Sequence, residues 1–313
     1  MLKMKNTASV YDESPSYAFI KSLSVSSLRP TAIRSIILIF NNFFFRQYRA
    51  AWLPGRIPVS RVDHPLDLRI PFVPSWVTIY LDFVPFWVRM VSFLLRVYGH
   101  RALDAVRDFI ATMGELYCAA AEVYQKNLST TDRPFYIARP RFFLIHLADP
   151  HLMCIPSLHV MVVIRTYTKF AAILRLLNED KHCSAQIEEM KQGALAITQA
   201  ILFVKQHSIN CIAASLYAMT RFDGKLFPPE EAESFTSLIF SSPPPVPSGP
   251  DGCLSKNYRL RPCAAPRTKL PESDIAEIRT HIISLYRHFL AQGKTAQNWT
   301  DPLLGFMQSL PQR

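Results

Sequence analysis

The stretch ALDAVRDFIATMGELYCAAAEVYQ, residues 102–125, has the repeat of an amphipathic α-helix. Its apolar side chains recur every three or four residues, as in Leu103, Val106, Phe109 and Met113. We interpret this stripe as a face that packs against a protein core. Similar apolar segments predict further helices at residues 31–50, 75–98, 157–178, 188–204 and 207–222.

Composition favours helices over sheets. Hydrophobic residues make up 49% of the 313 residues, which is enough for a sizeable core. Glycine is scarce at 9 residues while proline reaches 24, and few Asn-Gly or Asp-Gly hairpin signals occur. The sequence therefore predicts an all-α fold, a membrane-embedded bundle of about six apolar helices followed by a Pro-rich linker and a C-terminal helix.

Changes in composition along the chain predict three parts. Residues 1–30 are polar and Ser-rich, and we expect a flexible N-terminal segment there. Residues 31–222 hold the predicted bundle. Residues 223–313 are expected to be an appendage without chemistry: SSPPPVPSGPDG at 241–252 is a Pro-rich linker, and a last helix is predicted at 272–292.

The charge balance indicates a polyanionic partner. Lys and Arg number 35 against 24 Asp and Glu, which gives a net charge of +11. Nucleic acid, an anionic membrane surface and phosphate groups would all suit such an excess. Nucleic acid is not expected, because no zinc-ligand pairs, aromatic sheet signature or concentrated basic stripe is present. The basic residues instead lie among and at the ends of apolar segments, as at a lipid interface.

Two interpretations of the apolar segments compete. The mean hydropathy is only +0.09, and no charge-free run reaches the roughly 18 residues of a clear membrane span. A soluble protein with long core helices fits these values. The segment 70–95, however, carries Asp82 and Arg89 inside an apolar stretch, and intramembrane charges usually face a polar cavity. We therefore expect a multi-pass membrane protein. Tryptophan and tyrosine are frequent at membrane interfaces, and this segment carries such residues near its ends: Trp76, Tyr80, Trp87 and Tyr98.

Three stretches carry residues suited to phosphate chemistry. A loop at 126–156, interrupted by prolines, contains Arg133-Pro134 and Arg139-Pro140. Pro156-Ser157-Leu158-His159 opens an apolar helix, where free backbone N–H groups favour an anion. Lys205-Gln206-His207 precedes another apolar helix. Histidine can act as nucleophile or acid near neutral pH, and arginine matches phosphate oxygens. His146 and His151 lie in the same loop, but we favour structural or exposed roles for them.

These motifs, in this order, resemble those of the type 2 phosphatidic acid phosphatase superfamily. That family is marked by Lys-x6-Arg-Pro, Pro-Ser-x-His and a His that is preceded by Arg or Lys and followed four residues later by Asp. The Lys-Gln-His form and the stretch PLDLRIPFVPSWVTIYLDFVPFW at 65–87 are similar to the membrane branch related to inositolphosphorylceramide synthases. The resemblance covers residues 60–220 and identifies the chain as a divergent member.

The resemblance implies a role for each matching residue. His207 would be the nucleophile that forms a phosphohistidine, and His159 the general acid for the departing alcohol. Ser157 and the backbone after it would bind phosphate oxygens, with Lys205 beside the nucleophile. The first motif is ambiguous: Lys126 and Arg133 have the family spacing, whereas Arg139 lies nearer the Pro-Ser-x-His turn and is favoured for phosphate contact. Neither a metal nor a cofactor is implied.

One position departs from the family pattern. The Asp that would hydrogen-bond the nucleophilic His is replaced by Cys211, which has no carboxylate. Loss of an orienting Asp can cost orders of magnitude in rate, as it does in serine proteases. Either another carboxylate substitutes, with Asp149, Asp82 and Asp67 as candidates, or the activity is weak or absent.

The leading hypothesis is a metal-independent phosphatase or phosphotransferase that acts on a lipid phosphate, either a phospholipid or an isoprenoid phosphate, through a phosphohistidine. The main alternative is a catalytically impaired relative that serves as a lipid-binding or structural membrane protein. A third is a soluble helical enzyme of the acid-phosphatase type. Membrane lipids are the expected partners, and the sequence does not define an oligomeric state.

Overall fold

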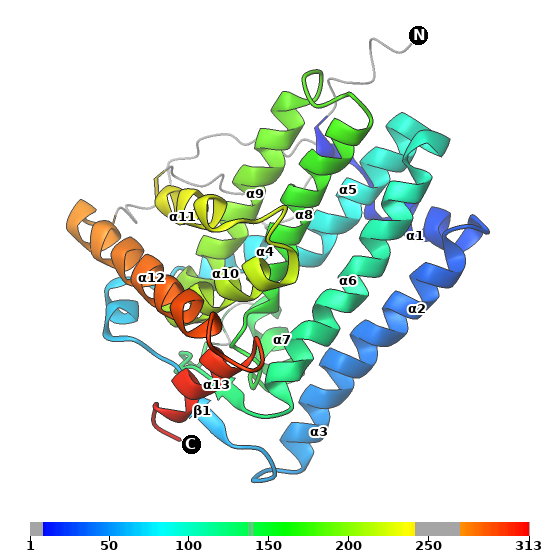
Figure 1. Cartoon of the computed structure of the whole chain (residues 1–313). Coiled ribbons are helices and arrows are strands. Elements are labelled where there is room, and N and C mark those ends of the chain that lie inside the picture. Colours follow the sequence, from blue (N-terminus) through cyan, green and yellow to red (C-terminus); the bar gives the residue numbers. More distant parts are fainter. Residues whose placement is uncertain (1–8, 137, 139, 242–269, 313) are drawn as a thin grey trace.

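A computed structural model describes residues 9–241, except 137 and 139, and residues 270–312 (Figure 1). Helices account for 71% of it and strands for 3%, so the predicted all-α class is confirmed. The expected Pro-rich linker at 241–252 lies almost wholly outside the described residues.

Thirteen α-helices are described, interrupted by short turns of other helical types. They are α1 (Pro15–Ser24), α2 (Arg29–Ile39), α3 (Arg46–Trp52), α4 (Val77–Tyr80), α5 (Phe83–Tyr98), α6 (Leu103–Tyr124), α7 (Pro140–Ala148), α8 (Leu158–Leu176), α9 (Ser184–Phe203), α10 (Ile209–Asp223), α11 (Pro229–Leu238), α12 (Glu272–Gly293) and α13 (Asp301–Gln308). A π-helical segment, Phe40–Phe45, joins α2 to α3, and 3-10 turns occur at Val10–Asp12, Pro65–Arg69, Pro74–Trp76 and Gly99–Ala102.

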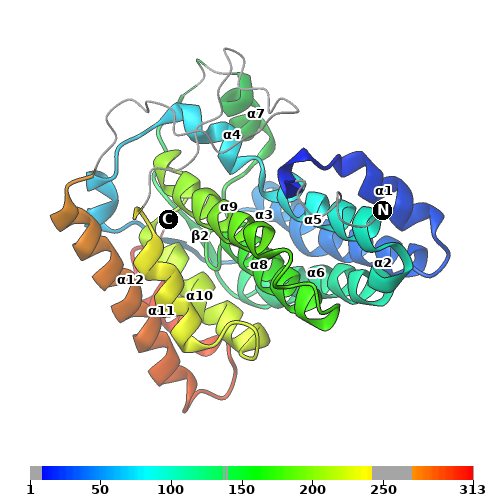
Figure 2. The same cartoon turned by 90° about the horizontal axis from the view of Figure 1, so that it is seen from above.

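The long helices form one packed body. Helices α5, α6, α8, α9 and α10 lie at its centre, with α2 and α3 along one outer edge beside α6 and with α12 on the opposite side (Figures 1 and 2). The apolar stripe predicted on α6 is indeed inside, because Val106, Phe109 and Met113 are almost fully buried. All the helical ranges predicted from apolar periodicity are helical in the structure, apart from short breaks and frayed ends.

The N-terminal segment differs from the expectation of a flexible 1–30. Pro15 stands at the first position of α1, where its fixed φ suits a helix start. The helix packs against α5, and the buried Ala18 N–H donates to Ser92 Oγ at 3.1 Å. The sequence did not indicate this contact, because the many short polar residues of the segment leave only a narrow apolar face on the helix.

The C-terminal part is also not the separate appendage that was predicted. Helix α12 packs along α10 and presents a fully buried stripe of Ile278, Ile282, Tyr286 and Phe289. The Tyr286 hydroxyl lies 2.9 Å from Thr220 Oγ1 on α10, which fixes the register of the two helices. Residues 272–308 therefore belong to the same core as the central helices.

A two-stranded parallel sheet lies beneath the bundle. Strand β1 (Val59–Arg61) pairs with β2 (Leu128–Thr130) in the register Val59 to Leu128. Within β2, Ser129 also forms a bridge to Met153, so that the chain entering and the chain leaving the 131–152 segment are held side by side. This pairing anchors both ends of the loop that carries His151 and Arg133.

One helical stretch within the described residues, Pro74–Tyr124, is long and apolar enough to cross a membrane, and 72% of its most apolar window is buried inside the protein. Helix α1 and the continuous α2–α3 segment meet the same test only together, as a pair bent by 117°. Such lengths also occur in core helices of soluble proteins, so they give limited support to membrane association.

Candidate functional site

The Pro-Ser-x-His turn is hydrogen-bonded to the middle of α10. Ser157 is fully buried and stands just before α8. Its N–H donates to Ser215 Oγ at 2.8 Å, and the Ser215 hydroxyl lies 2.7 Å from the carbonyl of Cys211. The Tyr124 hydroxyl donates to the carbonyl of Pro156. The Ser157 N–H is therefore already used within the protein, which leaves its hydroxyl and the N–H groups after it for the predicted phosphate contact.

The structure brings His159 and His207 together, although they lie on different helices and far apart in sequence. Their ring centroids are 5.4 Å apart. The Ser157 hydroxyl lies 3.4 Å from His207 Nε2. The His159 ring lies between the rings of Tyr80, at 4.4 Å, and Phe83, at 4.1 Å. Aromatic packing thus holds one imidazole in place beside the other.

A tight turn between α9 and α10 positions His207. Lys205 adopts a positive φ of 55°, and the N–H groups of Gln206 and His207 both donate back to the carbonyl of Ile201. Ser208 then caps α10, its hydroxyl accepting from the Asn210 N–H at 3.2 Å. The reversal directs the His207 side chain toward the Pro-Ser-x-His turn.

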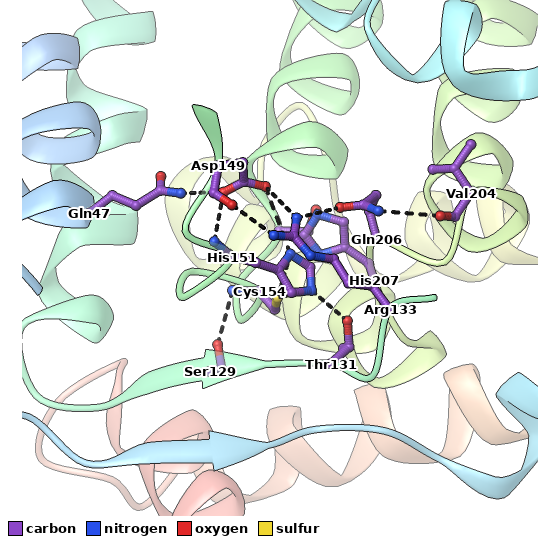
Figure 3. A network of polar contacts seen from close by, with 11 residues as sticks. Gln47, Ser129, Thr131, Arg133, Asp149, His151, Cys154, Val204, Gln206 and His207 are labelled. Atoms are coloured by element: carbon purple, nitrogen blue, oxygen red, sulfur yellow. Dashed lines mark hydrogen bonds and ion pairs between the residues drawn. The ribbon is translucent and has the colours of Figure 1, made fainter. Parts of the chain in front are cut away.

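A polar network lies directly beside the His207 imidazole (Figure 3). Arg133 donates to the Asp149 carbonyl at 2.9 Å and to Gln206 Oε1 at 3.2 Å. The Asp149 carboxylate accepts from the His151 N–H at 2.9 Å and from Gln47 Nε2. His151 also contacts Asp149 through its ring, with 3.8 Å between Nδ1 and Oδ2. One carboxylate is therefore shared by an arginine, a histidine and an amide.

His151 connects this network to the histidine pair. Its ring centroid is 6.3 Å from that of His207, and its Nε2 lies 2.8 Å from Thr131 Oγ1. Only 6% of its surface is exposed, and its φ is 58°. The structural or exposed role expected for His151 is thus too weak a description, because the residue lines the same cavity as His159 and His207.

The cavity between these side chains is small. Its volume is about 30 Å³, and its polar walls come from Gln47, Asp149, His151, His159 and His207. A volume of this size holds one or two water molecules. A phosphoryl group therefore requires the walls of this cavity to move apart.

Burial keeps both imidazoles uncharged at neutral pH. It lowers the pKa of His159 to about 4, with the Asp149 charge opposing only in part. Burial, and secondarily the neighbouring His159 and His151, hold the pKa of His207 well below its usual range. Within the described residues His207 Nδ1 has no hydrogen bond of normal geometry, although the Cys154 carbonyl favours the protonated ring electrostatically.

The proposed phosphate-binding residues do not all reach this place. Arg133 does, through Gln206 and Asp149. Lys205 turns away and donates to the carbonyl of Asp67, and Lys126 lies at the other end of its loop, 3.3 Å from Thr300 Oγ1. Arg139, the favoured arginine, lies outside the described residues.

Among the three candidate carboxylates, only Asp149 lies at the histidine cavity. Asp67 is used at the start of α10, where Oδ1 accepts from the Ile209 N–H at 3.0 Å and Oδ2 from the His64 N–H at 2.8 Å. Asp82 forms a buried ion pair with Arg89 at 2.5 Å. Asp149 itself engages Arg133 and His151, not His207, and these contacts outweigh the effect of burial so that its pKa is lowered.

Sequence reasoning missed Gln47, Thr131 and Gln206 as members of this network. Gln206 lies inside the Lys-Gln-His motif, but no local pattern marks Gln47 or Thr131. Gln47 extends from α3 to Asp149 across 102 positions of sequence. No group of three or more His, Cys, Asp or Glu side chains in the described part of the chain is arranged to hold a metal ion.

Comparison with known proteins adds no family assignment: no family model, no curated protein and no solved structure matched the chain. The resemblance to the type 2 phosphatidic acid phosphatases therefore depends on the motifs and on the geometry described above.

Proposed function

We propose that the protein is a phosphatase or phosphotransferase for a lipid phosphate, and that His207 is its nucleophile. The observation that carries the proposal is the 5.4 Å separation of His159 and His207, from two motifs that lie in the order of the family. A nucleophilic histidine and a second imidazole for the leaving oxygen are what metal-independent phosphoryl transfer needs.

The chemistry follows from the protonation of the two rings. Neutral His207 offers a nitrogen lone pair to phosphorus, and the P–O bond to the lipid alcohol breaks as the N–P bond forms. His159 gives a proton to the departing oxygen, so it must be protonated first. A bound phosphate dianion beside it would raise its pKa. Water, or a second alcohol in a phosphotransferase, then takes the phosphoryl group from His207.

Among the described residues that were expected to bind phosphate, Arg133 is the cation that belongs to the polar network beside the histidines. Its Nη1 lies 3.8 Å from Asp149 Oδ2 and 3.2 Å from Gln206 Oε1. Arginine stabilises the equatorial phosphoryl oxygens through its planar fork. For this role Arg133 must exchange part of its contact with Asp149 for the phosphate, and this exchange would accompany the opening of the cavity.

A second candidate function is a lipid-binding protein without turnover. It is favoured by Cys211, which leaves His207 without an orienting carboxylate, and by the engagement of Asp149 with Arg133 and His151. An enzyme that lacks this orientation is expected to be slow. The two candidates share the binding of a lipid phosphate and differ only in the covalent step.

The proposal includes a membrane location, and in its finer form a multi-pass arrangement. Its support is the apolar stretch Pro74–Tyr124 together with the bent pair of α1 and α2–α3. The test is extraction of membranes from expressing cells with alkaline carbonate. Multi-pass insertion predicts that the protein stays in the pellet and needs detergent, whereas release into the supernatant would contradict it.

Catalysis is tested by phosphate release from phosphatidic acid in the presence of a metal chelator. The wild-type protein should release phosphate, and His207→Ala should abolish the release. His182→Ala is the matched control, because His182 is exposed at the far end of α8 and α9 and should have no effect. Gain of activity in Cys211→Asp would identify the missing carboxylate as the defect. If neither the wild-type protein nor Cys211→Asp releases phosphate, the result would favour the lipid-binding protein without turnover.

A further inference from the structure

A second, larger cavity opens beside α3. Its volume is about 670 Å³, within the range of ligand pockets. Three arginines line it, Arg46 and Arg49 from α3 and Arg56 from the turn that follows, and no acidic residue does. Within the described part of the chain, no carboxylate pairs with any of the three. Unpaired guanidinium groups gathered around one space favour an anion.

The segment that supplies the three arginines carries charge of one sign only. From Ser14 to Val62 there is no Asp or Glu, whereas the basic residues are Lys21, Arg29, Arg34, Arg46, Arg49, Arg56 and Arg61. The region therefore has a positive field of its own, beyond the net charge of the whole chain. A positive, acid-free surface attracts anionic lipids at the leaflet of a membrane.

The same helices expose an apolar stripe. Along α2, the π-helical segment and α3, large apolar side chains point outward, with Ile37 52%, Phe40 58% and Trp52 76% exposed. Ile33, Ile36, Phe44 and Phe45 continue the stripe at 45–53% exposure. Helices α2 and α3 lie on the outer edge of the molecule, and in the described part of the chain no other helix or strand lies along their outer face (Figure 1). Continuous apolar exposure of this kind marks an interaction surface.

The stripe and the cavity meet at the end of α3. Leu53 lines the cavity together with Arg46 and Arg49, and it adjoins the exposed Trp52 at the end of the stripe, so a polar head in the cavity would have its apolar tails next to the stripe. An anion with an apolar tail satisfies both features, whereas a soluble anion leaves the stripe uncovered. We propose that this cavity binds the phosphate group of an anionic phospholipid, with the stripe of α2 and α3 in contact with the acyl region of a bilayer.

The cavity also borders the histidine site. Met153 lines both spaces, and α3 places Gln47 toward the histidines while Arg46 and Arg49 face the larger cavity. A phospholipid bound in the larger cavity would fix the depth of the histidine site relative to the headgroups of the bilayer. The proposal concerns binding only and does not depend on catalysis by His207.

The test uses the full chain in a non-ionic detergent, titrated with dihexanoyl phosphatidylglycerol and followed by calorimetry. This lipid is a phosphodiester, so it is not a substrate for the phosphomonoester reaction proposed above. Dihexanoyl phosphatidylcholine reports the need for net charge, and glycerol phosphate reports the need for acyl chains. Phosphatidylglycerol should bind at least tenfold more tightly than either. Its binding should shift the Trp52 emission to the blue, and the shift should be lost in Trp52→Phe.

The variant Arg49→Gln/Arg56→Gln should weaken binding of phosphatidylglycerol about 25-fold, because each arginine near an anionic lipid is worth about fivefold. The control is Arg175→Gln/Lys181→Gln, which removes the same charge at the connection of α8 and α9, away from α3 (Figure 1). It should leave binding unchanged. Equal weakening by both pairs, glycerol phosphate binding as tight as the lipid, or no binding of the lipid would each overturn the proposal.

Discussion

Replacement of Asp149 by Asn should destabilise the protein by about 2 kcal/mol at pH 7. The carboxylate accepts from the His151 N–H at 2.9 Å and from Gln47, and it faces Arg133 at 3.8 Å. Hydrogen bonds to charged groups contribute roughly 1.5–3 kcal/mol each. The amide keeps the shape and one acceptor oxygen, and 29% of the native side chain is exposed to screening solvent, so we take a value near the lower end of this range.

The loss of unfolding free energy in Asp149→Asn should decrease as the pH falls. The contacts with His151 and Arg133 lower the pKa of Asp149 below its usual 3.8. A carboxyl group with a lowered folded pKa contributes its full stability above the unfolded pKa and loses it as the pH falls through the folded value. The difference in unfolding free energy between wild type and Asp149→Asn should therefore be constant from pH 7 to 5 and narrow below pH 4.

The assay is urea denaturation at pH 7, 5 and 3.5, followed by circular dichroism. Asp104→Asn is the control, because Asp104 is 88% exposed and its ion pair with Arg107 lies on the surface. Such a pair contributes about 0.5 kcal/mol or less. If Asp149→Asn costs no more than Asp104→Asn, or if its effect does not change below pH 4, the polar network beside the histidines is not the anchor described here.

Three further predictions follow from packing and burial. Gly193→Ala should lower the unfolding free energy by about 1–3 kcal/mol, because the added Cβ would lie 2.1 Å from the Tyr11 hydroxyl. Gly305→Ala, where the Cβ would meet open space, should be neutral or stabilising by up to about 1 kcal/mol, and thermal melts compare the two variants. Phe289→Ala should lower the global unfolding free energy by about 3–4 kcal/mol in urea; an unchanged global transition would instead make α12 a separate unit. His159→Gln should flatten the fall in stability from pH 7 to 5, since a histidine whose pKa is lowered to about 4 stabilises fully above 6.5 and less as the pH falls; equal slopes in the two proteins would refute this.

Periodicity in the sequence was a reliable guide to the helices. The stripe on α6 and the apolar runs of α8, α9 and α10 are long enough that burial decides their structure, and each is helical as predicted. The organisation of the chain was less predictable. Helix α12 has a polar, charged sequence, and its four buried side chains become part of the core only because α10 provides a matching face. The local sequence of a helix does not predict which other helix it packs against.

The same division holds for the site. The meeting of His159 and His207 was an expectation from motif order, and the structure places the rings side by side. The Asp149 network was not foreseeable in this form, because Arg133 and His151 reach the same residue from opposite sides of helix α7 in the sequence. The positive φ of His151 and Lys205 shows how the loop and the turn achieve this. The sequence therefore indicated the imidazoles and named Asp149 and Arg133 as candidates, but it did not indicate the contacts that join these two residues to His151, Gln47 and Gln206.

The most direct test of the central claim is detection of phosphate on His207. The wild-type protein is mixed with phosphatidic acid that carries labelled phosphate, quenched in alkali within milliseconds to seconds, and analysed by mass spectrometry under conditions that preserve phosphohistidine. The account predicts a phosphorylated peptide that contains His207 and its absence in His207→Asn. Label on another residue, or turnover of the lipid in His207→Asn at the wild-type rate, would contradict it.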